Sequence, residues 1–149
     1  MPRTRHLGLA CERAVCEALK SSMDHRLGAA VVYDRRIVAC GHNHHMPDSF
    51  GDAVIHSVHA EMAALAMLAH WPRGRLRHCA LVVVRIGQAS MDHPLKLARP
   101  CAACAAAIDA LGIGRVYFST QREFDARIAH YELHTSPGGH RRGNGGKCN

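Results

Sequence analysis

The chain has 149 residues, of which 48% are hydrophobic, and a formal net charge of +7 at pH 7. This length and composition suit one globular domain with a substantial core, and no apolar run approaches the roughly 18–20 residues that a membrane-spanning helix needs. The opening residues, MPRTRHLGLACER, contain no apolar signal core, so we expect no secretory peptide, no membrane partner and, by default, a cytoplasmic location.

The first half of the chain predicts a helix, a hairpin and a second helix. Small or apolar residues recur with a helical period over residues 6–23. LGAAVVY (27–33) and IVACGH (37–42) predict two strands joined by a turn at residues 34–36, and the polar stretch 43–55 predicts a loop. The alanine-rich run SVHAEMAALAML (57–68) predicts a helix with Ser57 as its N-cap, which ends before Pro72. We place the three arginines that follow, at positions 73, 75 and 77, in a loop.

The second half predicts two further strands around a helix. CALVVV (79–84) indicates a buried strand, and a loop over residues 87–99 leads to the helix PCAACAAAIDALG (100–112), with Pro100 at its start and Gly112 at its end. VYFST (116–120) indicates another strand. The run ARIAHYEL (126–133) follows after five residues, too few for a parallel crossover, which needs a dozen or more. We therefore predict an antiparallel strand there, with a short terminal helix as the alternative.

This order of elements predicts a three-layer α/β/α sandwich with a mixed sheet of about five strands. We expect residues 1–134 to form a single domain. The glycine-rich basic tail, residues 135–149, is expected to be disordered.

The seven cysteines do not suggest a disulfide framework. Cys101 and Cys104 lie three residues apart on one side of a predicted first helical turn. A helix N-terminus lowers thiol pKa values, so we expect both to be thiolates. The sequence around four others predicts small buried side chains: Cys11, Cys16, Cys40 and Cys79.

His59 and Glu61 open the alanine-rich helix. Burying a lone carboxylate is strongly unfavourable, so Glu61 needs a partner or a chemical function. One imidazole and two thiolates are ligands that Zn²⁺ prefers, and His59, Cys101 and Cys104 would leave one position open, as in catalytic sites. Glu61, two residues beyond the histidine, could then accept a proton from a zinc-activated water and pass it to a leaving group. We therefore expect one Zn²⁺ per chain.

Simpler interpretations of these residues stay open. A Cys-x-x-Cys pair by itself also occurs in redox proteins. Cys79 or His93 could close a purely structural zinc site. Four further histidines are expected around the mouth of a pocket, where a second metal site is conceivable: His42, His44, His45 and His56.

HAE (59–61) followed by PCAAC (100–104) resembles the zinc-dependent cytidine and deoxycytidylate deaminase superfamily, whose signature is H-x-E…P-C-x-x-C. The resemblance extends from HRLGAAVV through GIGRVYFS. It implies a mixed sheet with helices on both faces, zinc bound by His59, Cys101 and Cys104, and Glu61 as the proton shuttle. It further implies that the backbone N–H of Ala60 orients the base carbonyl and that Asn43 contacts the substrate, although Asn43 also fits a plain turn residue. Arg99, directly before the proline, could hold a substrate phosphate or a nearby acid.

The reaction that the resemblance implies is hydrolytic deamination of a cytosine-containing nucleoside or nucleotide to the uracil form, with release of ammonia. The alternative is deamination of cytosine or adenine in single-stranded DNA or RNA. The net charge favours the alternative, whereas the 5% aromatic content offers few platforms for stacking bases. A zinc-stabilised binding protein without turnover is the third hypothesis. The resemblance also implies a homo-oligomer, because small deaminase domains of this kind often assemble as dimers or tetramers.

Overall fold

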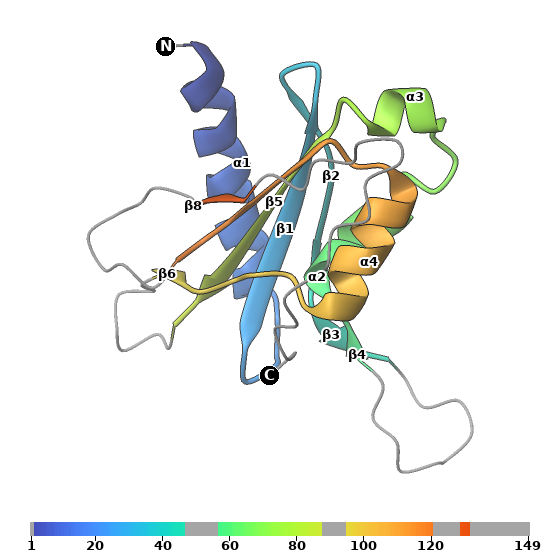
Figure 1. The fold of residues 1–149 in the computed structure, drawn as a ribbon. Coiled ribbons are helices and arrows are strands. Elements are labelled where there is room, and N and C mark those ends of the chain that lie inside the picture. The colour runs from blue at the N-terminus through green and yellow to red at the C-terminus, as the bar shows by residue number, and fades with distance from the viewer. Residues whose placement is uncertain (1, 47–56, 88–94, 121–128, 132–149) are drawn as a thin grey trace.

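The computed structural model describes residues 2–46, 57–87, 95–120 and 129–131. The elements form three layers, with α1 on one face of a mixed sheet and α2 and α4 on the other (Figure 1). This arrangement confirms the predicted α/β/α sandwich. In chain order the elements are α1 (Pro2–Leu19), β1 (Arg26–Tyr33), β2 (Arg36–His42), β3 (His44–His45), β4 (Ser57–Val58), α2 (Ala60–Ala66), α3 (Arg73–Leu76), β5 (Ala80–Ile86), β6 (Leu95–Lys96), α4 (Ala102–Leu111), β7 (Arg115–Phe118) and β8 (Ala129–Tyr131).

The strands of the main sheet run in the order β2-β1-β5-β7-β8. β1 is antiparallel to both β2 and β5, whereas β5 is parallel to β7. The two-residue strand β6 pairs with the end of β5. β8 is antiparallel to β7, with His130 opposite Tyr117, which confirms the predicted terminal strand and rejects the terminal helix.

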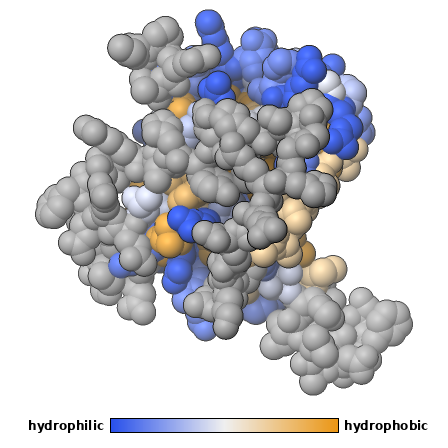
Figure 2. Space-filling view, viewed as in Figure 1, coloured by the Kyte–Doolittle hydropathy of each residue, from blue (hydrophilic) through white to orange (hydrophobic). Residues whose placement is uncertain are grey.

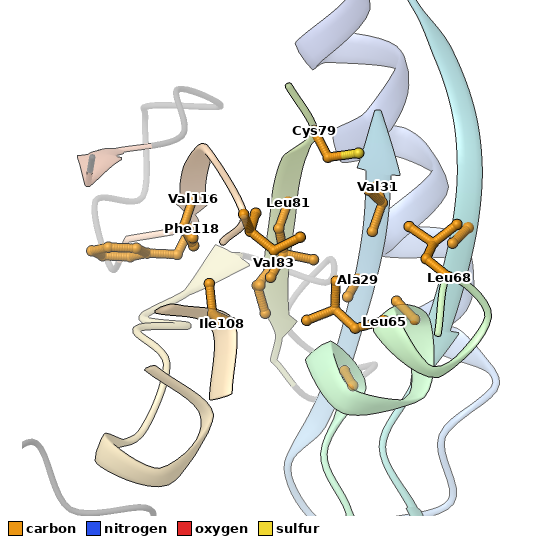
Figure 3. Close-up of a cluster of buried hydrophobic side chains, with 14 of the residues drawn as sticks. Ala29, Val31, Leu65, Leu68, Cys79, Leu81, Val83, Ile108, Val116 and Phe118 are labelled. Carbon is orange, nitrogen blue, oxygen red and sulfur yellow. The ribbon is translucent and has the colours of Figure 1, made fainter. Parts of the chain in front are cut away.

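The central strands are buried on both faces, and each face has its own core. Alternate residues of a strand point to opposite faces, so the apolar runs of β1 and β5 serve both layers. One core joins Ala30, Val82 and Val84 to the alanines of α1. The other lies between the sheet and helices α2 and α4, where Leu65 and Ile108 pack with Leu81 and Val83 (Figure 3).

Two glycines allow the helices to lie directly against the first hairpin. A Cβ at Gly28 would overlap the carbonyl oxygen of Ala14 in α1. A Cβ at Gly41 would lie 2.7 Å from the backbone nitrogen of Ala64 in α2. The close approach of α2 places its first turn, which follows His59 and carries Glu61, beside the end of β2.

Gly28→Ala is therefore expected to push α1 away from the sheet and lower the melting temperature by roughly 5–10 °C, since overpacking a core costs about 1–3 kcal/mol or more. Gly8→Ala is the matched control, because Gly8 is exposed in α1 itself and an added Cβ there would have nothing within 4 Å. That change should leave the melting temperature unchanged or raise it. Calorimetry of the two variants checks this packing, and equal melting temperatures would contradict it.

Several sequence predictions differ from the structure in detail. Ser57 is not the N-cap of α2, because it lies in β4 opposite His45 and the cap position falls on His59. α1 begins at Pro2 and ends at Leu19 rather than spanning residues 6–23, and Arg73 and Arg75 lie in the short helix α3 rather than in a loop. Of the four cysteines predicted to be buried, only Cys79 is; Cys11 and Cys40 are partly exposed and Cys16 is exposed.

Other predictions fall partly or wholly outside the described residues. The tail at 135–149, most of the loop 43–55 and part of the loop 87–99 lie there. The described ends of the first loop contain the small β3–β4 ladder. That residues 1–134 form a single domain stays a prediction.

Candidate metal centre and active-site cavity

His59, Cys101 and Cys104 come together where α2 and α4 begin, and their donor atoms all lie within 4.8 Å of one another. His59 Nδ1 is 3.0 Å from Cys104 Sγ and 3.6 Å from Cys101 Sγ. In a tetrahedral zinc site with Zn–S of about 2.3 Å and Zn–N of about 2.0 Å, donor atoms are about 3.5–3.8 Å apart. The 3.6 Å separation matches this spacing and the 3.0 Å separation is shorter, so the three donor atoms are grouped closely enough for one metal ion to contact all of them. One imidazole and two cysteine sulfurs are also the donors that zinc prefers.

Helix geometry places the two cysteines. Cys101 is the N-cap of α4, and its sulfur accepts a hydrogen bond from the backbone N–H of Cys104 at 3.4 Å. This is the usual N-cap contact to the third helical residue, and it directs both sulfurs to the same side of the first turn. Pro100 precedes the cap, and Gly112 ends the helix with a left-handed φ of 77°, as predicted.

His59 holds the equivalent cap position of α2, but its side chain makes no capping hydrogen bond. Its ring is turned toward the sulfurs instead. A histidine occupies a position that usually favours serine, threonine, asparagine or aspartate, which indicates that the ring is kept for the contact with the two cysteines.

Glu61 is a buried acid next to this cluster, with 3% of its surface exposed. Burial raises the pKa of its carboxyl group, while a hydrogen bond from its own backbone N–H and the nearby His59 lower it. The structure therefore places Glu61 in the interior, where its carboxylate needs a partner or a chemical function. A dication held by the neighbouring ligands would compensate the carboxylate charge.

The thiol of Cys104 responds to the same surroundings. Burial, and secondly the charge of Glu61, raise the pKa of Cys104 to about 12. The expectation that the helix N-terminus alone makes this group a thiolate is therefore wrong. A thiolate at this position requires a nearby cation, which is a further reason why the donor set suits a metal.

A cavity of about 700 Å³ opens beside the cluster. Its volume is in the range typical of small-molecule sites, about 300–1,000 Å³. His59, Glu61 and Cys101 contribute to its wall, so the acid and the metal ligands face a common space. The remaining wall comes from the α1–β1 connection, the start of β1, the residue after β2, one residue each of β3 and β4, the first residue of α2, the end of β5 and residues 97–100.

The three predicted substrate-contacting residues, Asn43, Ala60 and Arg99, all line this cavity. Ala60 is the first residue of α2, where the backbone N–H has no acceptor within its own helix. The guanidinium of Arg99 is exposed and lies 5.7 Å from the centre of the Phe118 ring. Whether these three residues contact a substrate stays a prediction.

Asn43 has a structural function that the sequence did not reveal. Its side-chain oxygen accepts a hydrogen bond from the backbone N–H of Leu27 at 2.9 Å, and its amide nitrogen donates to the carbonyl of His25 at 2.6 Å. The side chain therefore ties the end of β2 to the beginning of β1. One amide hydrogen remains to interact with a ligand in the cavity.

Sequence reasoning missed a pair of basic residues in the cavity wall. The Arg85 guanidinium donates to His25 Nδ1 at 2.6 Å, and both residues line the cavity. Arg85 is the single charge in the apolar run of β5, which is the signal that could have identified it. Of the four histidines predicted at the mouth, His45 lines the cavity, whereas His42 contacts Glu17 of α1.

The alternative metal arrangements find no support among the described residues. Cys79 donates to the carbonyl of Arg75 and is not part of the donor cluster, so it does not close a fourth position. Within the ranges that the structure describes, the histidines at 42, 44 and 45 form no second cluster of three donors. His56 and His93 lie outside those ranges.

This donor set, fixed at the starts of two helices on one mixed sheet, is that of a zinc-binding domain. The chain belongs to the family described as "Cytidine and deoxycytidylate deaminase zinc-binding region", whose sequence profile matches residues 4–120. The family assignment confirms the resemblance seen in the sequence, and zinc is the expected metal. No curated protein matches the sequence. No helix in the described ranges is both long and apolar enough to span a membrane.

Solved structures show the same fold. Cytidine deaminase from Burkholderia pseudomallei matches with a TM-score of 0.55 and 24% identity, over 82% of this chain and 90% of that one. dCMP deaminase from the cyanophage S-TIM5 matches with a TM-score of 0.54 and 22% identity, over 75% and 80% of the two chains. RibD from Acinetobacter baumannii matches with a TM-score of 0.52 and 17% identity, over 78% of this chain and 28% of that one.

Proposed function

We propose that the protein is a zinc-dependent hydrolytic deaminase that converts a cytosine-containing nucleotide or nucleoside to the uracil form and releases ammonia. The observation that carries the proposal is the buried Glu61, which faces the same 700 Å³ cavity as His59 and Cys101. A structural zinc site has no use for a buried carboxylate that opens onto a cavity. A hydrolytic site needs one for proton transfer.

His59, Cys101 and Cys104 would hold the metal, which when bound supplies a Lewis acid that makes water a nucleophile near neutral pH. Glu61 accepts one proton from the attacking water and delivers it to the ring nitrogen. It then passes the second proton to the exocyclic amine, so that the carbon–nitrogen bond breaks and ammonia leaves. The water oxygen becomes the uracil carbonyl. The backbone N–H of Ala60 and the remaining amide hydrogen of Asn43 would orient the base.

The formal charges of the cavity wall balance, so it is the two arginine side chains themselves that support a phosphate-bearing substrate over a neutral nucleoside. Arg85, Arg99 and His25 all line it, against the carboxylates of Asp24 and Glu61. Arginine presents a planar set of donors that matches phosphate oxygens. The described lining contains no phenylalanine, tyrosine or tryptophan, and this favours a free nucleotide over a nucleic-acid strand, whose neighbouring bases would need stacking surfaces.

The test is a panel of dCMP, CMP, deoxycytidine, cytidine and a cytosine-containing single-stranded oligonucleotide, incubated with zinc-loaded protein. Ammonia release and the ultraviolet change on deamination are followed together. We expect turnover of a free nucleotide. Turnover of the oligonucleotide alone would favour the nucleic-acid alternative. No turnover of any compound would leave a zinc-stabilised binding protein.

Arg85→Gln is expected to raise KM for the nucleotide about tenfold or more, because a hydrogen bond to a charged group contributes about 1.5–3 kcal/mol. KM for the corresponding nucleoside should change little. Lys96→Gln is the matched control, since Lys96 lies opposite Arg85 in the β5–β6 ladder but does not line the cavity. Equal effects of Arg85→Gln on KM for the nucleotide and for the nucleoside would contradict a phosphate contact.

Assembly into a dimer or tetramer stays a prediction, and equilibrium sedimentation of the zinc-loaded protein would measure it.

A further inference from the structure

A second cavity, of about 540 Å³, lies at the end of the sheet away from the metal centre. It is formed by the N-terminal part of α1, the β1–β2 turn, the segment after α3 and the connection from α4 to β7. These elements meet at the upper end of the molecule in Figure 1, whereas α2 and α4 begin at the lower end. Figure 2 shows strongly hydrophilic surface across the same upper end. The deaminase chemistry proposed above makes no use of this region.

The titratable side chains in the wall of this cavity are predominantly basic. Three are arginines and two are histidines, against one carboxylate, the phenol of Tyr117 and the thiol of the buried Cys79. With both histidines neutral, the wall still has an excess of two positive charges. Like charges that share a cavity repel each other, and an anion bound between them would attract each of them and offset that repulsion. The basic residues and the carboxylate are His6, Arg35, Arg77, His78, Arg115 and Asp34.

Two of the arginines form no ion pair with a carboxylate in the part of the chain that the structure describes. All ion pairs among the described residues converge on Glu17, so neither Arg35 nor Arg77 forms one with a carboxylate in that part of the chain. Arg77 donates to His78 Nε2 at 3.3 Å, and this hydrogen bond orients its guanidinium beside the imidazole of His78. Guanidinium groups without a carboxylate partner are suited to bind phosphate oxygens in pairs.

The backbone of Arg35 points to the same function. Asp34 and Arg35 have φ angles of 47° and 65°, the left-handed values of a type I′ hairpin turn, in which glycine is strongly favoured at the second position. A residue with a long side chain is strained there, and strain of this kind is often retained for function. Because Arg35 is exposed, packing does not account for it.

Close backbone packing holds the other two arginines near each other. A Cβ at Gly114 would overlap the carbonyl oxygen of Arg77, so the two chain segments lie in direct contact. The backbone N–H of Arg115 donates to the carbonyl of Cys79 at 3.4 Å. Arg77 and Arg115 therefore lie on adjacent backbone segments, and both residues line the cavity together with Arg35.

We propose that this cavity is a second binding site, for a small phosphate-bearing anion. Its volume admits a molecule of about nucleotide size, and its arginines come from three separate segments of the chain. The inference does not depend on the proposed deaminase function.

Titration calorimetry of the zinc-loaded full chain with pyrophosphate tests the proposal. We expect saturable binding with one site per chain that involves the basic cavity. Arg35→Gln and Arg77→Gln should each weaken the dissociation constant about tenfold or more. Arg36→Gln is the matched control, because Arg36 is exposed in the next position of the same hairpin but does not line the cavity. It removes the same charge and should leave binding unchanged within a factor of two to three.

Arg35→Gly separates function from folding. Glycine suits the left-handed backbone, so this variant should keep or raise the melting temperature while it loses pyrophosphate affinity. The absence of saturable binding by the wild-type chain would overturn the proposal, as would equal weakening by Arg36→Gln, which would indicate diffuse charge. Binding of a single-stranded oligonucleotide that requires Arg35 and Arg77, without binding of pyrophosphate, would also overturn it in favour of a nucleic-acid surface.

Discussion

Glu61→Gln is expected to lower kcat for deamination by about 10²–10⁴-fold, the usual contribution of a positioned acid–base group, while one zinc ion per chain is retained. Glutamine keeps the size of the side chain and its place in the cavity wall, but it can neither accept nor deliver a proton. The metal ligands are unchanged, so zinc content should not fall. Ammonia release and elemental analysis of the same sample measure both quantities.

Glu17→Gln is the matched control for this variant. Glu17 is also buried, with 4% exposed, but its carboxylate contacts Lys20 at 2.8 Å, His42 at 3.2 Å and Arg13 at 3.8 Å, away from the cavity. Removing that charge should lower the melting temperature and leave kcat per folded molecule unchanged. Retained turnover in Glu61→Gln, or an equal loss of kcat in both variants, would contradict the proposal that Glu61 transfers protons.

The donor cluster could be predicted from sequence because each ligand sits at a helix start that local signals define. The cysteines follow Pro100 and precede a run of alanines that Gly112 ends, and His59 precedes a second alanine-rich run. In a sandwich of this order, two helices on the same face of the sheet bring their first turns together. The strands were equally clear, because the apolar runs in β1 and β5 are buried on both faces.

The contacts that line the cavity depend on register, which no local pattern encodes. Arg85 reaches His25 because β1 and β5 pair with Leu27 opposite Arg85, and a shift by one residue would turn Arg85 to the other face. The same holds for the amide of Asn43, whose partners lie in a segment 16–18 residues earlier. The N-cap of α2 was predicted wrongly for a different reason. Serine is favoured at this position, but Ser57 pairs with His45 in the β3–β4 ladder and the helix begins after His59.

Cys104→Ala is expected to weaken zinc binding at least about 100-fold, since structural zinc sites contribute about 10–16 kcal/mol in apparent binding free energy shared among four ligands. The purified variant should therefore contain much less than one zinc per chain. It should also melt at a lower temperature than the wild type, because an ion that binds only the folded state stabilises it. A chelator should lower the wild-type melting temperature toward that of the variant and leave the variant itself unaffected.

Cys79→Ala distinguishes loss of a ligand from loss of a buried thiol. Cys79 is 1% exposed, like Cys104 at 3%, but its sulfur donates to the carbonyl of Arg75 and it is not a member of the donor cluster. Its replacement should lower the melting temperature modestly through the lost packing, with full zinc content and an undiminished response to chelator. A chelator response that persists in Cys104→Ala would mean that the stabilising metal is bound elsewhere, and the metal centre built on His59, Cys101 and Cys104 would then be wrong.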